Sequence, residues 1–111
     1  MTENDYRIFH IVKGDSVEIK SAIFADGDTY VVWDLQNEVI YIWIGSKSTI
    51  DEKFAAAELT QSKLIEEHRD IEIKTIDQGK EPREFLELFG GNIKFVKGDV
   101  ASLLKPRGKK K

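Results

Sequence analysis

Two neighbouring stretches of the sequence are apolar at nearly every position, and they constrain the fold more than any other feature. Residues 29–35 and 38–44 are rich in β-branched and aromatic side chains, and Gln36 and Asn37 mark a turn between them. A strand that is apolar on both faces is buried on both faces, so it belongs in the middle of a sheet. The chain therefore needs a sheet that is covered by helices above and below.

The flanking segments supply the rest of such a fold. Alternating or β-branched patterns predict further strands at 7–12, 17–23, 71–76 and 93–96. Residues 51–68 have the composition of a long helix that Ser48 or Thr49 caps, and Glu81-Pro82 opens a short helix that Gly90-Gly91 ends. The predicted fold class is an α/β sandwich, with a mixed sheet of five to six strands between one long and one short helix.

The length of 111 residues fits one domain, which we expect at 6–104 between a flexible N-terminus at 1–5 and a disordered basic tail at 105–111. The absence of Cys excludes a disulfide framework, a thiolate metal site and a Cys nucleophile. The polar, acidic start has no signal-peptide pattern, and no apolar run is long enough to span a membrane. We therefore expect a cytoplasmic protein.

The formal net charge of −3 conceals an asymmetry between the body of the chain and its end. The tail carries five basic residues, Lys105, Arg107, Lys109, Lys110 and Lys111, and the remainder has a balance of −8. An acidic body argues against a nucleic-acid-binding fold. The tail is suited to anionic lipid headgroups, at about 1 kcal/mol per basic residue near the surface, which predicts only a salt-sensitive attachment.

No catalytic constellation is visible. Residues 45–48 lack the first glycine of a phosphate-binding loop, and no Gly-x-Ser-x-Gly occurs. His10 and His68 lie on different elements without a partner at helical spacing, so we interpret His10 as a strand residue and His68 as a helix-end cation. Residues 26–28 start like an EF-hand loop, but its twelfth position is Asn37. We expect the protein not to be an enzyme.

Four segments, each at the right spacing from the next, resemble the gelsolin-like domain. They are Gly27-Asp28-Thr29-Tyr30-Val31-Val32, Tyr41-Ile42-Trp43-Ile44-Gly45, Asp51-Glu52 followed by Ala55-Ala56-Ala57, and Lys97-Gly98-Asp99-Val100-Ala101-Ser102. The last of them is similar to a segment of the first domain of gelsolin, and the resemblance covers residues 6 to 104. It implies a fold related to that of actin-depolymerising factor, in a cytoskeleton-associated actin-binding domain that calcium ties together.

The resemblance also implies an intradomain calcium site. Its ligands fall on the backbone carbonyls of Gly27 and Val100 and on the carboxylates of Asp28 and Glu52. Calcium takes about six to eight oxygen ligands, so this set would join a strand start, a helix start and the C-terminal segment around one ion. With two carboxylates we expect an affinity on the order of micromolar to millimolar.

Each acidic residue of this site has a simpler interpretation. Asp28 beside Gly27 is also typical of an ordinary turn, and Glu52 lies three residues after Thr49 as in a capping box. The family's second calcium position, shared with actin, needs an acidic residue late in the long helix. Residues 63–65, Lys-Leu-Ile, offer none.

The long helix has two unlike faces. At about 100° per residue, Ala56, Leu59 and Thr60 share the face expected on the sheet. On the opposite side lie Phe54, Gln61 and Ile65, with Glu58 and Ser62 beside them. The resemblance implies that this outer face enters a hydrophobic cleft on actin. The alternative is that a loop covers Phe54 and that Ile65 is a stray exposed residue.

These observations predict a calcium-dependent regulator of actin or an actin homologue, which binds monomers or caps a filament end and is itself monomeric when free. Strong severing is not expected, because one domain lacks a second grip on the filament. Two alternatives stay open. One is a module that binds anionic lipid or phosphoinositide through the basic tail, and the other is a structural module of the same fold without actin or calcium.

Overall fold

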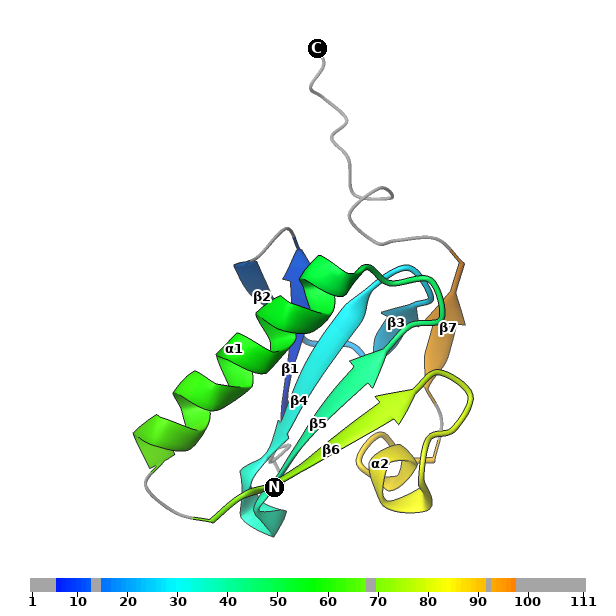
Figure 1. Ribbon diagram of the computed structural model, residues 1–111. Coiled ribbons are helices and arrows are strands. Elements are labelled where there is room, and N and C mark those ends of the chain that lie inside the picture. The colour runs from blue at the N-terminus through cyan, green and yellow to red at the C-terminus, as the bar shows by residue number, and fades with distance from the viewer. Residues whose placement is uncertain (1–5, 13–14, 68–69, 92, 98–111) are drawn as a thin grey trace.

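The fold is built on the mixed sheet that the sequence predicts. A computed structural model describes residues 6–12, 15–67, 70–91 and 93–97. Within these residues, five strands form a sheet in the order β2-β1-β4-β5-β6 (Figure 1). Their bounds are Arg7–Val12 for β1, Asp15–Ile19 for β2, Thr29–Asp34 for β4, Val39–Ile44 for β5 and Glu72–Asp77 for β6. All neighbours are antiparallel except β5 and β6, which are parallel and joined through a helix.

The expected single strand at 17–23 is wrong, because this stretch is divided between two sheets. After β2 ends at Ile19, the chain bends, and β3 (Ile23–Ala25) pairs in parallel with β7 (Lys94–Val96) in a separate two-stranded sheet. Burial does not follow the sequence alternation beyond the bend, since Ile23 is exposed whereas the next residue, Phe24, is fully buried. Burial of Phe24 in the core requires β3 to leave the line of β2.

The long helix α1 (Ile50–Glu67) crosses one face of the five-stranded sheet. It begins with the predicted capping box: the Thr49 amide donates to Glu52 Oε1 and the Glu52 amide donates to Thr49 Oγ1, both at 3.1 Å. The short helix α2 (Arg83–Glu87) follows Pro82, and Gly90 and Gly91 end the segment with φ of 77° and 92°. Positive φ is the conformation that favours glycine.

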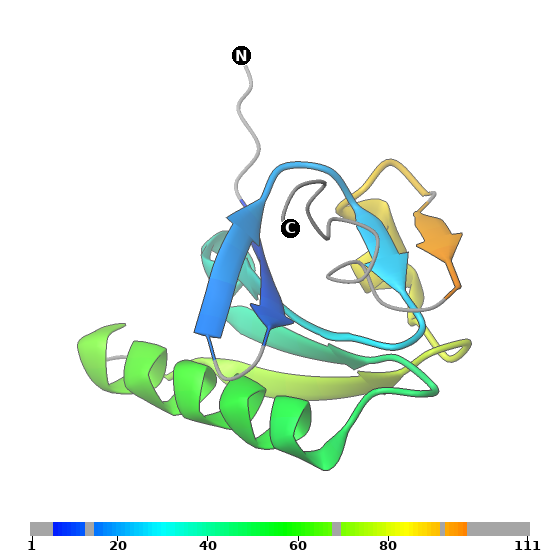
Figure 2. The ribbon, with the colours of Figure 1, turned by 90° about the horizontal axis from the view of Figure 1, so that it is seen from above.

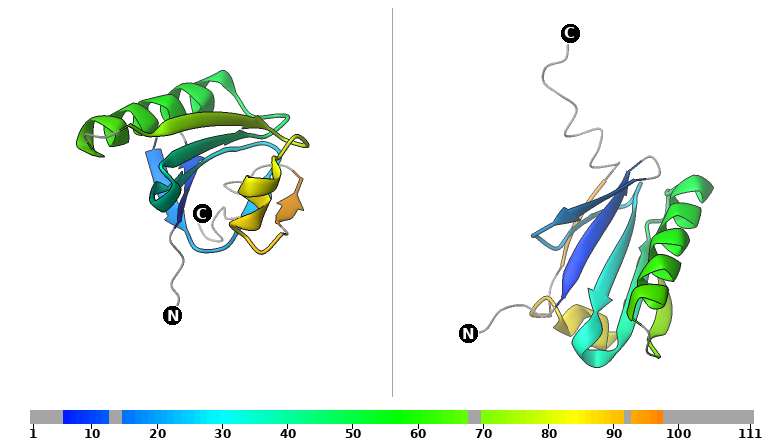
Figure 3. Two further views of the ribbon diagram at one scale, coloured as in Figure 1. Left: turned by 90° about the horizontal axis from the view of Figure 1, so that it is seen from below. Right: turned by 90° about the vertical axis from the view of Figure 1, so that its left-hand side faces the viewer.

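Each face of the central strands has its own core. The face under α1 buries Phe9, Ile11, Val31, Trp33, Ile40, Ile42 and Ala56. The opposite face buries Ile8, Phe24, Tyr30, Val32, Val39, Tyr41, Trp43, Ile76 and Phe85. Viewed from above and from the side, α1 lies on one side of the sheet, and α2 with β3 and β7 lies on the other (Figures 2 and 3). The predicted sandwich between a long and a short helix is therefore confirmed.

Some expectations fall on parts of the chain that are not described. These are the flexible start at 1–5, the last residues of the domain expected at 6–104 and the basic tail at 105–111. Among the helices of the described residues, none combines the length and the apolarity that crossing a bilayer requires.

Candidate functional site

The turn between β3 and β4 carries the first two predicted ligands, Gly27 and Asp28, and its backbone is held tightly. The Asp28 amide donates to the Ala25 carbonyl at 3.1 Å, and the amides of Gly45 and Lys47 donate to the carbonyls of Asp28 and Asp26 at 2.9 and 2.7 Å. A Cβ at Gly45 would lie 2.5 Å from the Asp26 oxygen and 2.7 Å from the Asp28 oxygen. The end of β5 therefore fixes this turn by direct backbone contact.

The carboxylate of Asp28 is buried rather than exposed as in an ordinary surface turn. Its residue is 1% exposed, and Oδ2 lies 2.9 Å from Nε2 of His10, which is 4% exposed. The His10 ring stacks on Tyr30, with centroids 4.9 Å apart and planes at 16°. Sequence reasoning placed His10 in its strand correctly but missed this partner, because only the pairing of β1 with β4 reveals it.

Glu52 combines its capping role with closeness to Asp28. The pKa of the Glu52 carboxyl is raised, first by burial and then by the negative charge of Asp28. The pKa of the Tyr30 hydroxyl is also raised. Burial is the largest cause, and the negative charges of Asp28 and Glu52 add to it. A strand start and a helix start thus bring Asp28, Glu52 and the Tyr30 hydroxyl into one electrostatic neighbourhood.

The chemistry of these donors suits a hard cation. The ionised form of Glu52, which the charge of Asp28 disfavours, would be stabilised by a divalent ion between the two carboxylates, and Gly27 adds a backbone carbonyl from the same turn. In the described part of the chain, no three His, Cys, Asp or Glu side chains are grouped so that they could hold a metal by themselves. The set therefore fits calcium only with further carbonyl or water oxygens. The expected carbonyl donor, Val100, lies outside the described residues.

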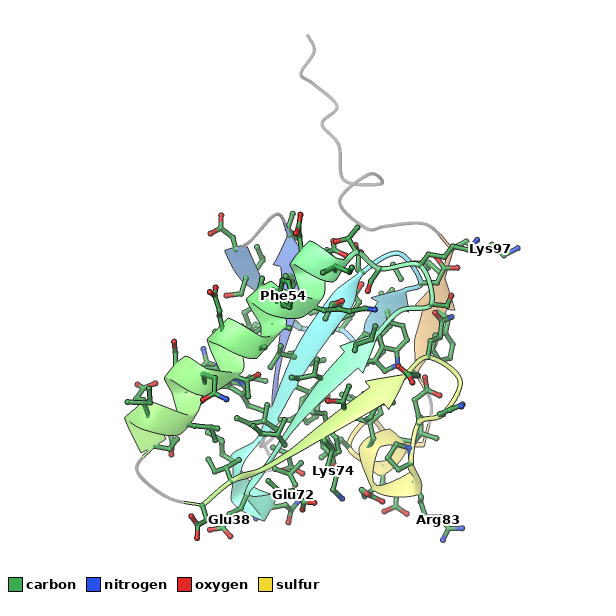
Figure 4. All side chains as sticks on the ribbon, in the orientation of Figure 1. Glu38, Phe54, Glu72, Lys74, Arg83 and Lys97 are labelled. Carbon is green, nitrogen blue, oxygen red and sulfur yellow. The ribbon has the colours of Figure 1, made fainter. Side chains whose placement is uncertain are left out.

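The outer face of α1 is exposed and partly apolar. Phe54 is 66% exposed and Ile65 is 71% exposed, whereas Ala56 and Thr60 on the inner face are buried. Figure 4 labels Phe54 on the first half of α1. Within the described residues, no loop covers Phe54, so this part of the alternative is wrong, whereas Ile65 is exposed as both interpretations expect. A shallow hollow beside Phe54 is lined also by Ala57, Glu58, Gln61 and Ser62.

A second hollow lies between α1 and the β1–β2 hairpin. Its lining comprises Ile11, Asp15, Ser16, Ala55, Glu58, Leu59 and Ser62. Glu58 and Ser62 border both hollows, so the predicted surface on α1 continues onto the hairpin. The sequence pattern of the helix alone did not indicate this extension, because it requires β2 to lie at the sheet edge beside α1.

Three further sets of residues remain from the sequence: the aromatic residues of the central strands, Lys63 and the basic tail. The aromatic residues Trp33, Tyr41 and Trp43 are buried, as expected for core residues rather than ligand platforms. Lys63, late in α1, lies over the Trp33 ring at 4.3 Å and pairs with Glu67 at 2.9 Å. The candidate lipid-binding residues, Lys105, Arg107, Lys109, Lys110 and Lys111, lie outside the described residues.

Two solved structures have a similar fold. In a crystal structure of the Thorarchaeota 2DGel3/rabbit actin complex, the matching chain has a TM-score of 0.72 and 37% identity, over 84% of this chain and 45% of the other. In the Thorarchaeota ProGel/rabbit actin complex, the matching chain has a TM-score of 0.68 and 26% identity, over 77% of this chain and 99% of the other.

Sequence comparison agrees. This chain is 32% identical over 94 residues to the "Actin depolymerising venom protein gelsolin 1" of Platymeris rhadamanthus, covering 71% of this chain and 23% of the relative. It is 34% identical over 94 residues to gelsolin of Xenopus laevis, covering 78% of this chain and 22% of the relative. The chain thus spans less than a quarter of the length of either relative. Residues 10–86 match the family model described as Gelsolin repeat. The chain therefore belongs to the gelsolin-repeat family.

Proposed function

We propose that this chain binds actin, or an actin homologue, through the outer face of α1 and regulates its assembly by binding monomers or capping a filament end. Two structures similar to this chain, 2DGel3 and ProGel, are complexes with rabbit actin. Members of the family bind actin and are not enzymes. This chain matches only part of its longer relatives, so their whole activities are not carried over.

The observation that carries the proposal is the exposure of two large apolar side chains, Phe54 and Ile65, on the helix face turned from the core. An amphipathic helix with an apolar outer stripe is suited to a hydrophobic groove on a partner. Full burial of one such side chain is worth about 1.5–3 kcal/mol. The polar residues between them, Glu58 and Gln61, line the adjoining hollow and supply specific contacts.

The first prediction concerns this helix face. Phe54→Asp and Ile65→Asp should each weaken binding of monomeric actin at least tenfold, because a charge replaces an apolar anchor. The wild-type protein should reduce the amount of actin that sediments as filament, and each variant should lose that effect. Circular dichroism should be unchanged, since both side chains are outside the core.

Val17→Asp is the matched control. Val17 is 51% exposed and pairs in register with His10, so it lies on the sheet face opposite α1. This variant adds the same charge and should keep wild-type affinity for actin. Equal binding by Phe54→Asp, Ile65→Asp and wild type would contradict the proposed interface, and no effect of stoichiometric wild-type protein on assembly would contradict actin regulation altogether.

The finer proposal is that calcium binds Gly27, Asp28 and Glu52, with Val100 as a further ligand, and controls the stability or orientation of α1. Its support is that the buried Asp28 carboxyl lies close enough to the half-buried Glu52 carboxyl, at the first turn of that helix, to raise the pKa of Glu52. When bound, calcium would supply two positive charges between them. Two contacts preorganise these residues before an ion binds. Gly45 packs against the turn between β3 and β4, and Thr49 caps the first turn of α1.

The second prediction tests calcium directly by isothermal titration calorimetry. Wild-type protein should bind with a Kd on the order of micromolar to millimolar. Asp28→Asn and Glu52→Gln should each abolish the heat of binding, although the glutamine of the second variant still serves the capping box. Asp26→Asn, in the same turn, is the control and should bind as wild type does. A flat trace for the wild-type protein would favour a structural module without calcium.

A further inference from the structure

We propose that His10 is a positioning residue for the ion site: it holds the Asp28 carboxylate in the orientation that calcium needs. This inference rests on the calcium site of the proposed function. His10 does not itself complete a metal-binding group of side chains within the described residues. It acts through Asp28, whose Oδ2 lies 2.9 Å from its Nε2.

Burial makes this contact decisive for the orientation of the carboxylate. The side chains of His10 and Asp28 are 5% and 2% exposed, so water cannot easily replace either partner. A buried carboxylate without a hydrogen bond is strongly disfavoured, and a rigid donor restricts how it can rotate. The bond to His10 therefore restricts the orientation of the Asp28 carboxylate.

His10 is itself held in place from two directions. Its strand, β1, lies between β2 and β4, and its neighbour in register on β4 is Tyr30, on which its ring stacks. The Tyr30 hydroxyl in turn accepts a hydrogen bond from the Ala25 amide at 2.9 Å. Side chains of β1 and β4 thus fix both ends of the turn, Ala25 through Tyr30 and Asp28 through His10.

This arrangement prepares the turn before an ion arrives. Gly27 lies between the two anchored ends and Asp28 is one of them, so binding need not order the Gly27 carbonyl or the Asp28 carboxylate. Residues that orient metal ligands in this way strengthen metal binding, and their loss typically lowers metal affinity by about 10- to 100-fold. We expect a loss in this range when His10 cannot donate a hydrogen bond or reach Asp28.

The experiment compares three substitutions in the full chain by calorimetry with calcium alone. His10→Phe keeps a ring for stacking on Tyr30 but has no nitrogen, and His10→Asn has an amide that is too short to reach Asp28. Both should bind calcium about 10- to 100-fold more weakly. His10→Gln places an amide nitrogen near the position of Nε2 and should recover an affinity within about threefold of wild type. Where His10→Phe does not fold, the comparison of His10→Asn with His10→Gln carries the test.

Two controls separate positioning from a general loss of stability. Ile40→Ala removes a fully buried side chain far along β5 from the turn, and should lower stability without changing calcium affinity. In calcium-free protein, His10→Phe should speed the hydrogen exchange of the Asp28 amide, which donates a hydrogen bond to the Ala25 carbonyl. The effect should be larger than on the amides of Val31 or Val32.

Equal calcium affinity of wild type, His10→Phe and His10→Asn would overturn the role of His10 while leaving the calcium site intact. Equal weakening by His10→Gln and His10→Phe would overturn it as well, since the bond to Asp28 would then not be the cause. Absence of calcium binding by the wild-type protein would instead overturn the calcium site, and the inference with it.

Discussion

At Gly45 the backbone leaves no room for any side chain. The carbonyl oxygens of Asp26 and Asp28 lie 2.5 and 2.7 Å from where a Cβ would be, which is well inside van der Waals contact. Both atoms belong to the backbone of a turn that is hydrogen-bonded to Gly45 and Lys47, so neither can rotate away. The identity of this one residue therefore determines how closely the turn that bears Asp28 approaches β5.

The third prediction follows from this contact. Gly45→Ala should lower the free energy of unfolding by about 1–3 kcal/mol, because the added methyl group forces the two backbone segments apart. Urea denaturation followed by tryptophan fluorescence measures the change. Ser46→Ala, at the exposed neighbouring position, should stay within about 0.5 kcal/mol of wild type. A Gly45→Ala protein as stable as Ser46→Ala would show that the turn adapts without cost.

Single residues also show what the sequence could and could not predict about the site. Asp28 and Glu52 were found through spacing that resembles a known family, and the capping box of Glu52 through local geometry alone. The bond between His10 and Asp28 joins positions 18 residues apart in the chain, and no local pattern encodes it. A polar residue within an otherwise apolar strand was the one signal that pointed to a buried partner.

At the scale of elements, helical periodicity predicted both faces of α1 because this helix is a regular crossover on a sheet. The strand patterns were less informative. The alternation through Val17, Ile19 and Ile23 continues without a break in the sequence, yet the chain bends after Ile19 and joins a second sheet. Strand pairing depends on distant partners, here β7, which a local pattern cannot specify.

The β1–β2 hairpin at the sheet edge depends on an ion pair whose strength varies with pH. Arg7 Nε and Nη2 donate to Glu18 at 3.0 and 2.8 Å, and the guanidinium lies 5.3 Å from the rings of Phe9 and Trp33. The hydrogen bonds from Arg7 hold the pKa of the Glu18 carboxyl below its usual range. The pair thereby ties the edge strand to the core under α1.

The fourth prediction is the sign of this pH dependence. A carboxyl with a lowered folded-state pKa adds stability above its unfolded pKa of about 4.3, and that stability is lost as pH falls through the folded-state pKa. Glu18→Gln should therefore cost about 0.2–1 kcal/mol at pH 7, the range for a solvent-exposed pair, and progressively less towards pH 3. Urea denaturation of both proteins across this range measures the difference.

Salt provides the control for this ion pair. Sodium chloride at molar concentration screens exposed charges over a few ångströms, so it should shrink the difference between wild type and Glu18→Gln at pH 7. A difference that is independent of both pH and salt would mean that the Glu18→Gln substitution disturbs packing rather than charge.

At the scale of the whole molecule, one sheet separates two cores, and the candidate ion site joins elements from both sides of it. Asp28 is next to Tyr30, which belongs to the core under α2, whereas Glu52 belongs to α1, which covers the other core. An ion held by both residues would connect α1 to the β3–β4 turn. Its binding should then stabilise the two cores together rather than one loop.

The fifth prediction tests this coupling with two fluorescent probes. Trp33 lies in the core under α1 and Trp43 in the opposite core, so Trp43→Phe and Trp33→Phe proteins each report on one core. At a calcium concentration about one hundred times the Kd, binding to the folded state alone adds about 2.7 kcal/mol to the free energy of unfolding. Both probes should show this increase in urea denaturation, with coincident transitions.

Glu52→Gln supplies the control, since calcium should leave both transitions unchanged when that carboxylate is absent. If calcium shifted the transition that Trp33 reports and left that of Trp43 in place, the two cores would unfold separately, and the ion would act on α1 alone. Coincident shifts would instead mean that occupancy of a few oxygen atoms at the first turn of α1 changes the stability of the entire sandwich. In either case calcium would raise the fraction of chains whose outer helix face is folded and ready for a partner, but only coincident shifts would make that fraction follow the stability of the whole fold.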